Sequence, residues 1–147
     1  MEKIEVLVQK MAPDSVVPKY AHEGDAGVDL YSAGTFTLQP GQRLLVPTGI
    51  KMAIPHGYEG QVRPKSGLAL KHGLTVLNTP GTVDAPYRGE VGVIVINHDP
   101  KLAYEIKKGE KIAQMVFNKV EYVTFKETSE LAVTTRGEGG YGSTGKH

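Results

Sequence analysis

The stretch Asn78 to Glu90 reads NTPGTVDAPYRGE and stands between two apolar runs. Gly81 permits close approach of two backbone segments, and Pro86 fixes φ where the chain turns. Asp84 and Tyr87 lie three positions apart in this turn. We predict a rigid hairpin whose backbone amides and carbonyls recognise a flat polar molecule by its edge. Taken alone, the stretch is also explained by an ordinary surface hairpin in which Asp84 caps a turn.

Short apolar runs rich in valine and isoleucine extend on both sides of this stretch. A period of two predicts a strand at Lys3 to Lys10, and the apolar run Val91 to Asn97 predicts a strand buried on both faces. Eighteen glycines and nine prolines punctuate the chain, which is typical of an all-β protein. Helical character is confined to Arg63 to Gly73, where Ser66 is expected to cap one or two turns. The predicted fold class is therefore all-β.

The composition limits the partners and the compartment. A chain of 147 residues fits one domain, and a formal charge of +1 gives no basic surface for duplex nucleic acid. No cysteine is present for a disulfide or a thiolate metal site. No run approaches the roughly 18 apolar residues of a membrane helix, and the N-terminus lacks the apolar core of a secretory signal. We predict a cytoplasmic protein that binds neither nucleic acid nor membrane.

The apolar pattern fades after Thr128, and the final segment RGEGGYGSTGKH contains five glycines. We predict a β core over residues 1–128 and a flexible glycine-rich arm over residues 129–147, within a single domain. A plain flexible terminus explains this composition. The functional alternative is a phosphate-binding loop in which glycines free the backbone amides and side chains add donors and a stacking ring. The residues proposed for that role are Arg136, Tyr141, Gly142, Ser143 and Thr144.

Further polar residues suggest phosphate chemistry elsewhere. Lys65, Ser66 and Gly67 offer an ammonium, a hydroxyl and an amide in succession, or simply a helix cap. Gln114 is polar within an apolar strand, so it must be hydrogen-bonded or line a cavity. Asp29 is either a turn residue or an indirect support for a hydrated cation. The sequence contains neither the GxxxxGK[ST] loop nor the local signature of a Ser/His/Asp triad, which favours attack of water on a phosphoanhydride with Asp84 as the base.

Five segments in fixed order resemble the five motifs of the trimeric dUTP diphosphatase (dUTPase) family, and together they span nearly the whole chain. They are AGVDLYSA (26–33), RPKSGLALKHG (63–73), NTPGTVDAPYRGE (78–90), GEKIAQMVF (109–117) and RGEGGYGSTG (136–145). The resemblance implies a jelly-roll-like β-barrel that forms a homotrimer and exchanges its C-terminal arm between subunits. It also implies hydrolysis of dUTP to dUMP and pyrophosphate with Mg²⁺, a reaction of nucleotide metabolism that keeps uracil out of DNA.

The resemblance further implies a role for each matching residue. Asp84 activates the attacking water, and Tyr87 packs against the deoxyribose where a 2′-hydroxyl would clash. Asp29 holds the water shell of the metal. Uracil is read by Asn78, Thr82 and Val83. The phosphates are contacted by Lys65, Ser66, Gly67 and Gln114, and the arm adds Arg136, Tyr141, Gly142, Ser143 and Thr144.

Three positions depart from the usual pattern of that family. Lys65 stands where arginine is common, so a bidentate fork becomes a point charge. Pro86 replaces a frequent second acid of the third motif, and Tyr141 replaces the usual phenylalanine. None of these changes removes the proposed base.

Two other functions remain open from the sequence. A dCTP deaminase shares this fold, although its expected Arg-Ser-Ser run and catalytic glutamate are replaced here by Lys65-Ser66-Gly67 and Asp84. The second alternative is a catalytically silent nucleotide-binding or regulatory trimer, which would need neither Asp84 nor an intact arm.

Overall fold

A computed structural model describes residues 3–147 and leaves out residues 1 and 2. Within the described range the chain forms ten β-strands and one short α-helix. This confirms the all-β class. The strands are β1 (Leu7–Lys10), β2 (Gly27–Tyr31), β3 (Phe36–Leu38), β4 (Arg43–Ala53), β5 (Tyr58–Arg63), β6 (Leu74–Val76), β7 (Gly81–Val83), β8 (Glu90–Asn97), β9 (Tyr104–Ile106) and β10 (Lys111–Lys119), and the helix is α1 (Ser66–His72).

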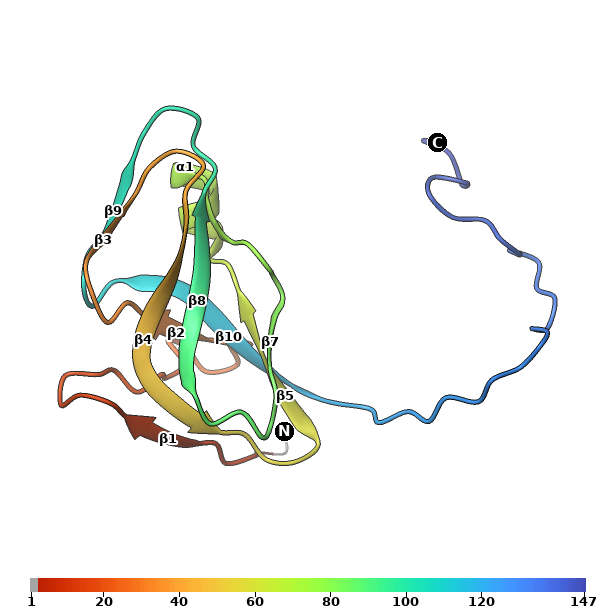
Figure 1. The fold of residues 1–147 in the computed structure, drawn as a ribbon, viewed down its shortest axis with the longest axis horizontal. Coiled ribbons are helices and arrows are strands. Elements are labelled where there is room, and N and C mark those ends of the chain that lie inside the picture. The colour runs from red at the N-terminus through yellow and green to blue at the C-terminus, as the bar shows by residue number, and fades with distance from the viewer. Residues whose placement is uncertain (1–2) are drawn as a thin grey trace.

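Two four-stranded antiparallel sheets make up the body of the molecule (Figure 1). One has the order β1-β4-β8-β6 and the other β2-β10-β5-β7, while β3 and β9 pair separately. Completely buried side chains come from β2, β3, β4, β8 and β10, which places one apolar core between the layers: Leu30, Leu38, Val46, Val93 and Met115. Burial of these side chains is the main favourable term for the fold. The arrangement is the jelly-roll-like barrel that the family resemblance implies.

Strand β8 corrects one prediction. Its valines Val91, Val93 and Val95 are buried, but Gly92, Ile94 and Ile96 between them are only half-buried. The prediction of a strand buried on both faces was therefore wrong for the single chain. An antiparallel sheet with one face on the core leaves the alternate side chains on its outer face. Strand β8 consequently presents an apolar outer face.

The stretch Asn78 to Glu90 is not a hairpin, which corrects a second prediction. Strand β7 pairs with β5, whereas β8 pairs with β4 and β6 in the other sheet. The turn between them carries the chain from one sheet to the other instead of joining two paired strands. Asp84 and Tyr87 therefore lie on a bridge between the two layers.

The helix α1 is capped differently from the prediction. Lys65 occupies the N-cap position and makes no side-chain cap, so Ser66 is the first helical residue and not the cap. Gly73 ends the helix with φ of 67°, a left-handed conformation that glycine adopts without steric cost. No residue of α1 is fully buried, and its contact with the apolar core comes from the half-buried Leu68.

The chain beyond β10 forms no strand or helix and extends away from the barrel (Figure 1). Its start is held by the turn before β5: the Val120 amide donates to the Gly57 carbonyl at 2.8 Å, and the Tyr122 ring stacks on His56. Apolar side chains further along are almost fully exposed, among them Phe125 at 95%. The boundary between residues 128 and 129 stays a prediction. No helix in the described range is long and apolar enough to cross a membrane.

Candidate active site

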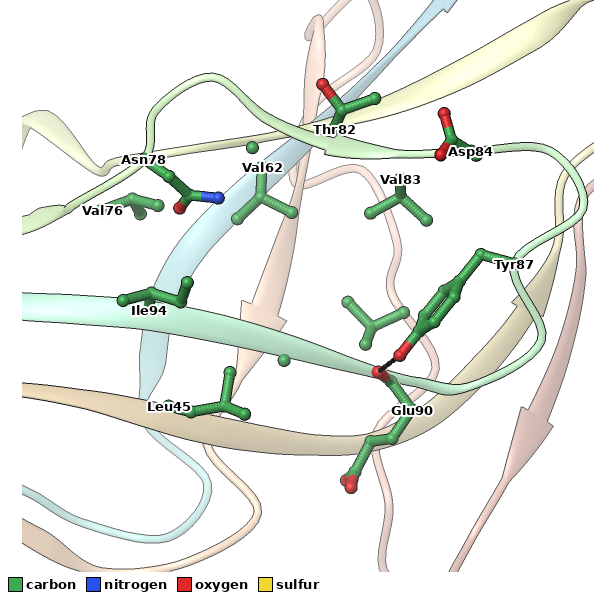
Figure 2. Close-up of a pocket in the computed structure, with 13 residues that line it drawn as sticks. Leu45, Val62, Val76, Asn78, Thr82, Val83, Asp84, Tyr87, Glu90 and Ile94 are labelled. Carbon is green, nitrogen blue, oxygen red and sulfur yellow. Dashed lines mark hydrogen bonds between the residues drawn. The ribbon is translucent and has the colours of Figure 1, made fainter.

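A pocket of about 250 Å³ lies between β7 of one sheet and β8 of the other. Apolar side chains from both sheets form much of its wall, including Val62, Val76 and Ile94 (Figure 2). Polar groups gather along the bridge between the sheets. Five predicted substrate residues line this pocket: Asn78, Thr82, Val83, Asp84 and Tyr87.

Strand β7, which carries Thr82 and Val83, is the edge strand of its sheet. Thr82 pairs with Gln61 of β5, and the opposite edge of β7 carries no paired strand among the described residues. An edge strand presents free amides and carbonyls, which are groups that can read the edge of a nucleobase. Figure 2 shows Val83 pointing into the pocket, whereas Thr82 and Asp84 rise from the other side of the strand.

Gly81 makes room for the side chain of Asn78. A Cβ atom at Gly81 would lie 3.2 Å from the Asn78 side-chain nitrogen. The close approach predicted at this glycine therefore involves a side chain from the loop before β7 and not only two backbones. The amide of Asn78 is directed toward the pocket (Figure 2).

The turn that follows β7 is fixed by its own hydrogen bonds. The Tyr87 amide donates to the Asp84 carbonyl at 3.1 Å, and the Arg88 guanidinium donates to the Ala85 carbonyl at 2.6 Å. Within residues 3–147 the carboxylate of Asp84 accepts no hydrogen bond and is exposed. The turn thus depends on the backbone of Asp84, and its side chain stays free for a ligand.

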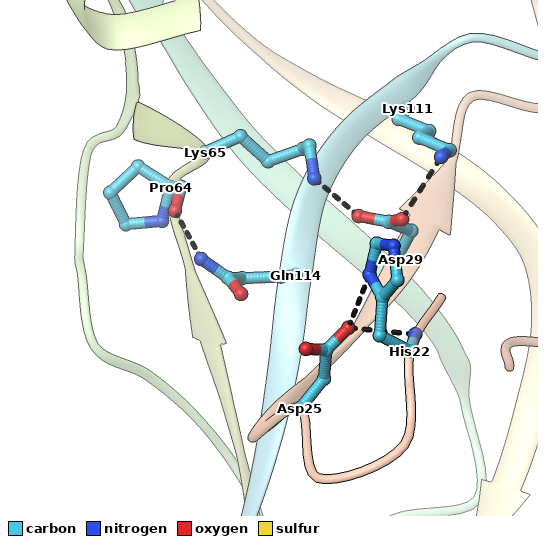
Figure 3. A network of polar contacts seen from close by, with 7 residues as sticks. All are labelled: His22, Asp25, Asp29, Pro64, Lys65, Lys111 and Gln114. Carbon is cyan, nitrogen blue, oxygen red and sulfur yellow. Dashed lines mark hydrogen bonds and ion pairs between the residues drawn. The ribbon is translucent and has the colours of Figure 1, made fainter. Parts of the chain in front are cut away.

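A second group of predicted residues surrounds Asp29 on the other half of the same sheet (Figure 3). One carboxylate oxygen of Asp29 is paired with the Lys65 ammonium, and the other lies 3.3 Å from the Lys111 ammonium. Burial disfavours ionisation of Asp29, but hydrogen bonds and charge from the two lysines outweigh burial and lower its pKa. Lys111 was missed from the sequence, because the residues that it meets are far away along the chain.

Gln114 connects this group to the segment before α1. It lies opposite Asp29 on β2 and opposite Arg63 on β5, and its side-chain amide donates to the Pro64 carbonyl at 3.0 Å (Figure 3). Gly27 allows this placement, because a Cβ atom there would lie 3.2 Å from the Gln114 Cδ. The polar residue in an apolar strand is hydrogen-bonded, as the sequence required.

The predicted phosphate donors Ser66 and Gly67 are exposed at the start of α1, next to Lys65. Lys65 and Gly67 also line a hollow of about 530 Å³ whose other walls include Lys71 and Lys111. The lining also includes Glu110, and Lys65 and Lys111 are already paired with Asp29, so the hollow carries only a modest excess of positive charge for an anionic ligand such as a phosphate chain.

The arm residues form a third group, separate from the other two in a single chain. Arg136 donates through Nε to the Gly139 carbonyl at 2.9 Å, and the Ser143 amide donates to the Gly140 carbonyl at 3.1 Å. Tyr141 is fully exposed and has a positive φ of 51°. Figure 1 shows the arm standing away from the barrel. One chain therefore brings together the base and sugar residues, and separately the Asp29 network, but does not join them to Arg136, Tyr141, Gly142, Ser143 or Thr144.

The described residues offer no cage for a metal ion. No group of three or more histidine, cysteine, aspartate or glutamate side chains lies together in residues 3–147. Both oxygens of Asp29 are already engaged by ammonium groups, which repel a dication. The residues present therefore do not fit a Mg²⁺ ion bound by the protein alone.

Comparison with known proteins identifies the family. The sequence model of the dUTPase family matches residues 14–145. The deoxyuridine 5′-triphosphate nucleotidohydrolase of Clostridium kluyveri is 54% identical over 142 residues, covering 97% of this chain and 99% of that protein. A Staphylococcus bacteriophage 80alpha dUTPase structure with dUpNHpp has a TM-score of 0.91 at 29% identity, covering 98% of this chain and 100% of that one.

A variant dUTPase from phage phi11 of S. aureus shows the same fold, with a TM-score of 0.81 at 24% identity and coverage of 88% of this chain and 100% of that one. That structure concerns the coordination of a structural Mg(II) ion in the phage protein. The family match over residues 14–145 and the high identity along nearly the whole chain lead to one conclusion: this chain belongs to the dUTPase family.

Proposed function

We propose that the chain hydrolyses dUTP to dUMP and pyrophosphate. The observation that carries the proposal is the bridge from β7 to β8, where Asp84, whose carboxylate is free, and Tyr87 belong to one turn and both line the pocket. The related Clostridium enzyme is named for this reaction. The cytoplasmic location of the present chain stays a prediction.

Uracil fits the polar edge of this pocket. The base presents an N–H donor between two carbonyl acceptors, and the Asn78 amide supplies both a donor and an acceptor. The free backbone edge of β7 around Thr82 and Val83 supplies further groups of both kinds. A site built from such fixed groups rejects analogues that leave a buried polar group unpaired.

Asp84 acts as the general base in this proposal. It accepts a proton from a water molecule, whose oxygen attacks the α-phosphorus of dUTP. The bond from that phosphorus to the bridging oxygen breaks, and pyrophosphate leaves with the electron pair. General base catalysis of this kind typically contributes about 10² to 10⁴ in rate.

The phosphate chain is bound by residues of other subunits in a homotrimer. Two apolar surfaces support association: the half-buried outer face of β8, which together with Leu45 of β4 at 64% exposure also lines the pocket, and the exposed segment that contains Phe125 and Val133. Since Asp84, the Lys65-Ser66-Gly67 segment and the arm lie apart in one chain, a shared site explains how they act on one substrate. The arm then closes over the bound triphosphate and excludes water.

Mg²⁺ enters this proposal on the substrate and not in a protein cage. A magnesium ion commonly keeps several waters and binds phosphate oxygens, and it would neutralise charge on the triphosphate. The role predicted for Asp29 reduces to holding Lys65 and Lys111 in place, because both oxygens already serve that purpose.

Pyrophosphate release from dUTP, UTP, dCTP and dTTP tests the reaction and its selectivity. We expect strong preference for dUTP, with ammonia release from dCTP absent. Release of ammonia from dCTP would instead support a deaminase, and no turnover of any nucleotide would support a silent binding protein.

Subunit mixing tests the shared site. Asp84→Asn chains and chains truncated before Arg136 are each expected to be nearly inactive. When the two are unfolded together and refolded as mixed trimers, sites that combine an intact Asp84 with an intact arm should restore part of the activity. Mixed trimers without any recovery would contradict a site shared between chains.

A further inference from the structure

Gly89 lies close to the hydroxyl end of the Tyr87 ring. A Cβ atom at Gly89 would stand 2.6 Å from Cζ and 2.8 Å from Cε1 of Tyr87, and closer still to its hydroxyl oxygen. The backbone of Gly89 is not in the left-handed region, so an alanine there is not excluded by its φ. The three nearest atoms all belong to the Tyr87 side chain, so the missing side chain at Gly89 is what allows Tyr87 to lie where it does.

Glu90 holds the same ring from the next position. The Tyr87 hydroxyl donates to the Glu90 backbone carbonyl at 2.8 Å (Figure 2). The Glu90 carboxylate in turn accepts the Gly49 amide at 2.9 Å, at a register shift in β4 where φ of Gly49 is 74°. This bond ties the bridge to the irregular part of a central strand.

We propose that Gly89 and Glu90 form a seat for Tyr87 and act as positioning residues for sugar selectivity. The inference depends on the proposed function, in which Tyr87 packs against the deoxyribose. Tyr87 is 47% exposed as a residue, so packing against neighbours restrains its ring only in part. Its position is set by the space above Gly89 and by the hydrogen bond to Glu90. Displacing the ring should open the space that a 2′-hydroxyl needs.

Gly89→Ala is the direct test. The ring end is the mobile part of a flexible side chain, so we expect it to shift while the barrel stays folded. The ratio of kcat/KM for dUTP to that for UTP should fall by about tenfold, since a steric contact of this kind discriminates against an added hydroxyl by at most about 10². Thermal unfolding checks that the variant remains native.

A readout without turnover follows the ring itself. In protein labelled with 3-fluorotyrosine, the ¹⁹F signal of Tyr87 can be assigned from its loss in Tyr87→Phe. Gly89→Ala should shift that signal and leave the other tyrosine signals in place. An unshifted signal would overturn the seat even if the enzyme proved to act on another nucleotide, which separates this inference from the proposed function.

Two comparisons make the result specific. In a Tyr87→Leu background, adding Gly89→Ala should change the ratio of kcat/KM for dUTP to that for UTP by no more than about twofold. The ring atoms that the new methyl group would displace are absent from that background. Gly34→Ala is the matched control, since its Cβ atom would lie 2.9 Å from Cζ of Phe36, outside the pocket. It should lower thermal stability without altering selectivity. An unchanged ratio in Gly89→Ala, with dUTP hydrolysis intact, would overturn the proposal.

Discussion

Asp29 and Lys65 form an ion pair across 36 positions of sequence, joining β2 to the residue that precedes α1. The Asp29 side chain is 11% exposed and the Lys65 side chain 30%. Lys111 completes the network on the other carboxylate oxygen. A partly buried carboxylate with two ammonium partners organises the start of α1, where Ser66 and Gly67 are exposed.

Asp29→Asn should lower the free energy of unfolding at pH 7 by about 1.5 to 3 kcal/mol, the usual range for hydrogen bonds to charged groups. The folded-state pKa of Asp29 lies below its ordinary value of 3.8. The stabilisation is therefore present above pH 3.8 and is lost as the pH falls through the lower folded pKa. Urea unfolding at one fixed protein concentration, from pH 7 to pH 3, should show the wild type and variant converging at the acidic end.

Asp14→Asn provides the control for that experiment. Asp14 pairs with the Lys108 ammonium, but both side chains are more than half exposed, at 60% and 56%. Exposed pairs contribute little to stability because water and salt screen them. No measurable loss is expected at any pH. If Asp29→Asn and Asp14→Asn lowered the free energy of unfolding equally, the ion pairs of Asp29 would contribute no more to stability than an exposed pair does.

The sequence predicted strands where alternate side chains face the core, but it did not predict which strands pair with one another. The period of two in Lys3 to Lys10 indicated a strand, yet β1 begins only at Leu7, because Leu7 pairs with Ala53, the last residue of β4. The alternation of apolar and polar residues indicates which side chains face the core, but it does not indicate which strand forms the backbone hydrogen bonds. For the same reason β7 was assigned to a hairpin although its partner is β5.

The sequence likewise predicted some residues of the candidate site and missed others. The motif residues were found from their types and order, and Asn78, Asp84 and Tyr87 of the third motif line one pocket. The pairing of Asp29 with Lys111 and the contact of Gly89 with Tyr87 were missed. The first depends on which distant strands meet in three dimensions, and the second depends on the direction in which the Tyr87 ring turns, which the residue types do not specify.

Asp84→Asn should abolish most turnover and preserve binding. An amide keeps the size and hydrogen-bonding capacity of the carboxylate but is a poor base, so hydrolysis should fall by about 10² to 10⁴. Pyrophosphate release measures the loss, and calorimetric titration with dUpNHpp should give a Kd within about threefold of the wild type. Asp14→Asn should retain full activity. Undiminished turnover in Asp84→Asn would remove this residue from the chemistry.

Deleting residues from Arg136 onward should leave the oligomer intact and depress hydrolysis by roughly 10²-fold or more, as loss of positioning commonly does. The deleted residues contribute exposed donors and one exposed ring but no large aliphatic side chain. Light scattering after gel filtration measures the mass, and pyrophosphate release measures the activity. A truncated chain that became monomeric would place part of the subunit interface in the arm.

Ending the chain at Lys119 should, in contrast, weaken the proposed homotrimer. This longer deletion also removes Phe125, Leu131 and Val133, which are 95%, 86% and 98% exposed in the single chain. Burying one such side chain against a neighbouring subunit contributes about 1.5 to 3 kcal/mol, so their joint loss should shift the protein toward monomers at micromolar concentration.

The point variant Phe125→Ser sharpens the same prediction, and Tyr141→Ser, which removes an equally exposed aromatic ring from the arm, is its matched control. Sedimentation equilibrium at several concentrations should show a weaker trimer for Phe125→Ser and an unchanged trimer for Tyr141→Ser. If the chain ending at Lys119 and the Phe125→Ser variant both associate like the wild type, the segment after β10 is a free terminus, and association must depend on the outer face of β8 alone.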